Sequence, residues 1–121
     1  MSAAQILADI RDALRGELGD GFSLISHFVE DQGKLLAEQA QFIADQRANG
    51  DLRTNDALYQ HFLKGLENNT INMARSVAML TALTIEKAWN TVANALWGGI
   101  SGILTAAGLP APLIPNAPPH V

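Results

Sequence analysis

Between residues 55 and 107 the chain carries one long helical pattern, in which polar side chains follow a single narrow line. Steps of three and four residues, with one gap, connect His61, Lys64, Asn68, Asn72, Arg75, Glu86, Asn90 and Asn94. Most of the positions on either side are apolar or small, and a helix that is apolar over most of its circumference is a buried one. The pattern therefore predicts a central helix whose buried side chains include Met73, Val77, Leu80, Ile85, Val92, Leu96 and Ile103.

The length of this pattern conflicts with a compact monomer. A straight helix over residues 55–107 would be roughly 80 Å long at 1.5 Å per residue, whereas a compact domain of this size has a radius of gyration of about 14 Å. Either the helix breaks, with residues 67–70 (ENNT) as the expected place, or an elongated chain buries its apolar faces against copies of itself. We favour the oligomer, and a break at Asn69 is compatible with it.

The rest of the chain also reads as helix. Ser2 and Gln5 have the form of a capping box that starts a short helix over about 3–17, and a glycine-rich turn separates it from a second helix over about 22–48. All five prolines lie in the last dozen residues, which predicts an extended tail. No strand or hairpin signal competes. We expect one all-α domain over residues 1–109, an elongated helical hairpin or bundle, followed by the tail at 110–121.

Residues 28–48 repeat a seven-residue phrase three times, FVEDQGK, LLAEQAQ and FIADQRA. At about 100° per residue the glutamine falls between the two apolar positions, inside the apolar stripe. Polar residues in a heptad seam fix register and oligomeric state, so the repeat predicts self-association. The alternative is a surface helix whose glutamine stems pack while their amides reach water. The predicted contact residues are Phe28, Val29, Gln32, Leu35, Leu36, Gln39, Phe42, Ile43 and Gln46.

The C-terminal third has no charged side chain from Ala88 onward. A solvated surface normally carries charges, so a protein partner is expected to cover this part. Trp97, Gly98 and Gly102 form a small-residue motif that allows either close helix packing or contact with lipid, and insertion of residues 88–109 into a membrane is the alternative. Asn90 and Asn94 weaken that alternative.

The proline-rich tail offers Pro110, Pro112, Leu113, Ile114 and Pro115 for docking into a groove. Proline-rich ends dock with little loss of entropy because their conformation is preset. Disorder of the chain end is the other interpretation.

Several function classes are not expected. A net charge of −4 with only 8 basic residues gives no phosphate-binding stripe, so nucleic acid is not an expected partner. His27, His61 and His120 lack the spacing of metal ligands, and no nucleophile or phosphate-binding motif occurs. No enzyme activity, cofactor or metal is therefore predicted. The N-terminus lacks the features of a signal peptide, which favours the cytoplasm or the inside of a larger particle.

The leading hypothesis is a non-enzymatic structural or assembly protein that self-associates and joins a larger complex, such as a virion or a cellular scaffold. A helical protein that associates with lipid is the first alternative. A bundle that binds a small ligand, haem or metal is the second.

Overall fold

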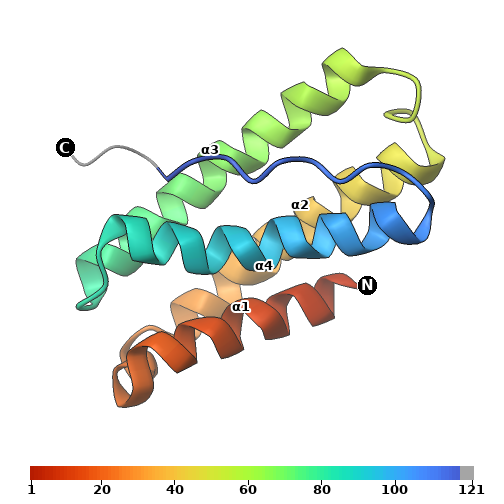
Figure 1. Cartoon of the computed structure of the whole chain (residues 1–121). Helices are drawn as coiled ribbons and strands as arrows, with labels where there is room; N and C mark the ends of the chain where they lie inside the picture. The colour runs from red at the N-terminus through yellow and green to blue at the C-terminus, as the bar shows by residue number, and fades with distance from the viewer. Residues whose placement is uncertain (118–121) are drawn as a thin grey trace.

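The computed structural model describes residues 1–117, which form four α-helices and one short 3-10 helix, with no strand among them (Figure 1). The elements are α1 (Ala3–Leu18), η1 (Gly19–Leu24), α2 (Ser26–Asn49), α3 (Asp56–Leu80) and α4 (Ile85–Ala106). The prediction of an all-α bundle is confirmed. The second helix begins later than predicted, because residues 19–24 adopt the tighter 3-10 conformation.

Side chains near the starts of the helices satisfy backbone groups that the helices leave free. The Ser2 hydroxyl accepts a hydrogen bond from the Gln5 amide nitrogen (3.3 Å), and Gln5 Oε1 accepts one from the Ser2 nitrogen (2.8 Å), which completes the predicted capping box. At the start of α3 the Asn55 side chain accepts a hydrogen bond from the Leu58 nitrogen, and at the start of α4 the Thr84 hydroxyl accepts one from the Lys87 nitrogen. These caps define where α1, α3 and α4 begin.

The long helical pattern breaks at residues 81–84, and the predicted break at Asn69 is wrong. Thr81 Oγ1 donates to the Val77 carbonyl (2.7 Å) and accepts from the Leu83 nitrogen (3.1 Å). Residues 67–70 instead continue α3, where the buried Thr70 hydroxyl donates to the Leu66 carbonyl (2.7 Å). The chain therefore folds back on itself, and its length no longer requires an oligomer.

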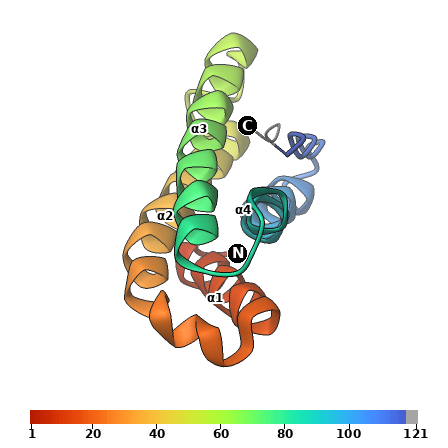
Figure 2. The ribbon, with the colours of Figure 1, turned by 90° about the vertical axis from the view of Figure 1, so that its left-hand side faces the viewer.

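Helix α4 packs against the other three α-helices, as α2 also does (Figure 2). The predicted core residues Met73, Val77, Val92 and Leu96 are buried, while Ile85 and Ile103 are partly buried. Leu80 is 54% exposed, so its prediction was wrong: it is the last residue of α3. The eight polar residues from His61 to Asn94 are all exposed, as their helical line predicts.

After α4 the chain reverses direction and runs back over the bundle as an extended segment (Figure 1). The reversal occurs at Gly108, whose φ of +77° is a conformation that residues with a β-carbon rarely adopt. The segment passes along α4 toward α3, and Leu109 and Ala117 pack against the core. We call residues 109–117 the tail.

Candidate association surface

The heptad repeat of α2 divides its two apolar positions between the core and the surface. Val29, Leu36 and Ile43 are buried in the core of the chain itself. The other line is Phe28, which is partly buried, Leu35, which is 61% exposed, and Phe42, which is 51% exposed. One line therefore holds the monomer together, and the other remains available at the surface.

The three heptad glutamines have three different environments. Gln39 Oε1 accepts a hydrogen bond from Asn69 Nδ2 of α3 (3.0 Å), so it meets a second helix within its own chain. Gln46 Oε1 accepts from the backbone nitrogen of Asp51 (3.1 Å) just beyond the end of α2. Gln32 is exposed. Two of the three glutamine side chains thus make hydrogen bonds inside the monomer.

A groove of about 300 Å³ runs between α2 and α3 beside the exposed line. Phe42 and Phe62 extend the apolar surface beyond the groove, with ring centroids 6.0 Å apart. We call this surface the α2–α3 face; it comprises Phe28, Gln32, Leu35, Gln39 and Phe42 of α2, and Phe62, Asn69, Asn72 and Ser76 of α3. Apolar side chains and short amides are both adapted to contact another protein.

Both helices beside this face carry charged side chains. Asp31, Glu38 and Asp45 are exposed on α2, where Lys34 offsets one of them by pairing with Glu38 at 4.0 Å. On α3, Arg75 is exposed, and Lys64 pairs with Glu67 of the same helix at 2.7 Å. Among residues 1–117, no ion pair involves Asp31, Asp45 or Arg75. Arg75 is therefore the cation of α3 that stands opposite the acidic residues of α2 without an ion-pair partner among the described residues.

The bond between Gln39 and Asn69 fixes the register of these charges. Helices α2 and α3 run in opposite directions (Figure 1), and both rise by about 1.5 Å per residue. Asp31 precedes Gln39 by eight residues and so lies level with Val77, close to Arg75. Asp45 follows Gln39 by six residues and lies level with Leu63, next to Lys64. The acids and cations are thus placed at matching heights on the two helices.

The small-residue motif of α4 is placed differently from its prediction. Trp97 is buried, but Gly98 and Gly102 are exposed and have no neighbour near the place of a β-carbon. Close packing within the chain occurs instead at Gly99, where a β-carbon would lie 2.5 Å from Ile6 Cγ1. None of the helices described over residues 1–117 is both long enough and apolar enough to cross a membrane.

The tail docks on its own chain. Pro112 and Pro115 are partly buried, whereas Pro110, Leu113 and Ile114 are exposed. The indole nitrogen of Trp89 donates a hydrogen bond to the Pro115 carbonyl (3.2 Å), and the Trp89 and Trp97 rings lie 6.2 Å apart. Sequence reasoning missed Trp89. Its spacing of eight residues from Trp97, which places both on one helix face, is the signal that could have found it.

Groups suited to chemistry are dispersed. His27 and His61 are exposed, and His120 lies outside the described residues. Over residues 1–117, no three acidic or histidine side chains come together as a metal site would require. Tyr59 is buried with its ring 4.3 Å from the Arg47 guanidinium, and burial raises the pKa of its phenol. Its hydroxyl has no hydrogen-bond partner among the described residues.

Comparisons with protein-family models, with curated proteins and with solved structures found no match for this chain.

Proposed function

We propose that this protein is a non-enzymatic assembly component that self-associates through the α2–α3 face. The observation that supports the proposal is the exposed line of Leu35 and Phe42 beside an amide-lined groove. The fold leaves these side chains in water although the second line of the same heptad forms the core. Burying them against another copy would remove apolar area from water, which is the dominant favourable term in association.

The charges of the face favour a second copy as the partner. In a two-fold dimer the same surface is used twice, so each contact occurs in duplicate. A two-fold axis lying between the copies, parallel to α2 and α3, would place α2 of one copy over α3 of the other. Because the axis preserves height along the helices, Asp31 of each copy would then lie close to Arg75 of the other. The face would in this way supply one complementary pair of charges, Asp31 and Arg75, in each half of the dimer.

The exposed side of α4 offers less to a partner. Its surface residues are Asn90, Asn94, Gly98 and Gly102, which provide no large apolar side chain. Specific interfaces derive most of their energy from a few large, well-buried side chains. The α2–α3 face, with two exposed large apolar residues and an adjoining aromatic pair, is therefore the better candidate.

A charge-reversal cycle tests the proposed dimer. Asp31→Arg would face Arg75 of the second copy, and with two such contacts per dimer the dissociation constant should rise about tenfold. Adding Arg75→Asp to the same chain should restore association. Sedimentation over a range of concentrations and salt would measure both. Restoration by the second change is expected only if the two side chains meet across the interface.

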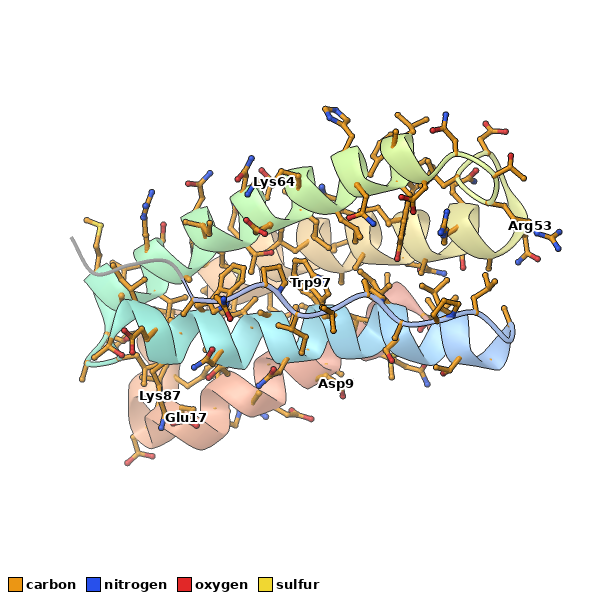
Figure 3. The ribbon with its side chains drawn as sticks, turned by 45° about the horizontal axis from the view of Figure 1, so that its top comes forward. Asp9, Glu17, Arg53, Lys64, Lys87 and Trp97 are labelled. Carbon is orange, nitrogen blue, oxygen red and sulfur yellow. The ribbon has the colours of Figure 1, made fainter. Side chains whose placement is uncertain are left out.

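Asp9→Arg is the matched control. Asp9 is also an exposed acid without an ion-pair partner in the described part of the chain, and it lies on α1, on the other side of the bundle from Lys64 of α3 (Figure 3). It brings the same change in net charge and should leave association unchanged. A native mass equal to that of the monomer at all concentrations, for the unmodified chain, would contradict the proposed function.

A further inference from the structure

Gly65 lies in the middle of α3, where the fold of the chain itself does not require a glycine. The residue is helical and its φ is not positive, so the backbone could carry any side chain. A β-carbon at this position would lie 3.9 Å from Gln39 Nε2, which is an ordinary contact. No other atom of the other described helices or of the tail lies within 4 Å of that point. Glycine inside a helix is less stable than alanine, so the monomer alone does not explain this residue.

The position of Gly65 places it on the α2–α3 face. It follows Phe62 by three residues and precedes Asn69 by four, so all three residues lie on one side of α3. Gly65 is partly exposed, and its missing β-carbon would point toward Gln39 of α2. A residue without a side chain at this point leaves a depression in the surface of the face.

Gly65 also belongs to a line on α3 with a spacing of seven residues. At about 100° per residue such a spacing keeps side chains on one side of a helix, and the members of the line are Leu58, Gly65, Asn72 and Met79. Met79 is 85% exposed and Leu58 is 38% exposed. The exposed line of α2 has the same spacing, since Leu35 and Phe42 are seven residues apart. Each helix of the face therefore presents one such line.

The two lines are in register. The hydrogen bond from α3 to Gln39 sets the relative height of the two antiparallel helices (Figure 1). Counted from this bond at about 1.5 Å per residue, Phe42 lies within one residue of the height of Gly65. Leu35 lies within one residue of the height of Asn72 by the same count. Each of these large side chains on α2 is thus level with a smaller residue on α3.

We infer that Phe42 of each copy packs into the depression at Gly65 of the other copy, an inference that rests on the proposed self-association. A two-fold axis parallel to the helices keeps heights unchanged, so the ring of Phe42, which is 51% exposed, would reach the level of Gly65 of the second copy. A second copy fits this surface because it carries both the ring and the depression, and the dimer would make the contact twice. Gly65 is thereby the residue of the face that selects its partner by shape.

The exposed glycines of α4 differ from Gly65 in this respect. Gly98 and Gly102 also have open space at the place of a β-carbon. The exposed residues of α4, however, include no large apolar side chain that could fill such a space in a second copy. Gly98 therefore provides a control position outside the α2–α3 face.

Gly65→Leu tests the contact. The added side chain has room in the monomer, and replacing a helical glycine should keep or raise the melting temperature. In the dimer it would occupy the space of the Phe42 ring, and overpacking at two symmetric contacts should raise the dissociation constant about 30-fold or more. Sedimentation over a range of concentrations would measure association. Thermal melts at a concentration where the chain is monomeric would show that the variant is folded.

Adding Phe42→Ala to the Gly65→Leu chain exchanges the large and the small residue between the two helices. Association should recover to within about fivefold of that of the unmodified chain, because the leucine would then fill the space that the ring leaves. Phe42→Ala alone should weaken association, since it removes the ring from the interface. Gly98→Leu is the matched control: it makes the same substitution at an open helical glycine of α4 and should leave the dissociation constant unchanged.

Three results would overturn the inference while leaving the dimer in place. They are a dissociation constant that Gly65→Leu does not change, equal weakening by Gly65→Leu and Gly98→Leu, and no recovery on adding Phe42→Ala. In each case the unmodified chain still associates, so the proposed function holds without this contact. An unmodified chain that stays monomeric at all concentrations would instead contradict the proposed function and the inference with it.

Discussion

Replacing Leu35 by Lys is the most direct test of the α2–α3 face. Full burial of a leucine side chain is worth about 2 kcal/mol, and Leu35 leaves 61% of its surface exposed in the monomer. Burying that fraction in a dimer therefore contributes about 1.2 kcal/mol per copy, or about 2.5 kcal/mol for the two copies. The loss of this term raises the dissociation constant about 60-fold. Burial of an unpaired lysine would increase the effect.

The measurement is a sedimentation or light-scattering titration of the Leu35→Lys variant between micromolar and high micromolar concentration. The melting temperature should change little, because substitutions of exposed residues usually alter the free energy of unfolding by less than about 0.5 kcal/mol. Leu24→Lys is the matched control: Leu24 is 79% exposed but lies in η1, outside the face. Equal effects of the two substitutions on association, or none from either, would refute the reasoning.

Two further predictions concern the stability of the monomer. Gly99→Ala should lower the free energy of unfolding by about 1–3 kcal/mol, since the added methyl meets the fully buried Ile6. Gly98→Ala has open space around it and should raise the free energy of unfolding by about 0.5–1 kcal/mol. Thermal melts in which the two substitutions change stability in the same direction would contradict the packing. Burial raises the folded-state pKa of the Tyr59 phenol, so its contribution to stability is complete below the ordinary value of about 10 and is lost as the pH rises above it. Tyr59 is the one tyrosine of the chain, so tyrosinate absorbance reports its titration alone, and Tyr59→Phe should remove this loss while keeping or increasing stability, because the hydroxyl has no partner among the described residues.

Helical spacing alone could predict much of the fold. The capping box at Ser2 and the face that carries Val92 and Leu96 depend on residues close together in the chain, and both are as expected. The position of the helix break depends on tertiary packing. Asn69 has a low helix propensity, but the difference is only about 0.7 kcal/mol per residue, and packing of Leu66 and Met73 on either side outweighs it.

A local signal for the true break was present at Thr84. A threonine that begins a helix is a preferred N-cap, and an acidic residue in the first turn, here Glu86, supports it. Glu86 resumes the polar line eleven residues after Arg75, which is three helical steps, so the line lacks only two positions across the loop at residues 81–84 and suggested one helix. The spacing of polar residues therefore could not distinguish one long helix from two helices whose exposed residues happen to continue the same spacing.

The candidate surface was predictable as a stripe but not as an interface. Two apolar positions per heptad lie about 100° apart, and the sequence does not indicate which of them faces the core. The structure decides this through neighbours distant in the chain: α1 and α4 cover the line of Val29 and Ile43, and the line of Leu35 does not receive a helix. The partner of Gln39 likewise depends on where α3 packs, which no local pattern specifies.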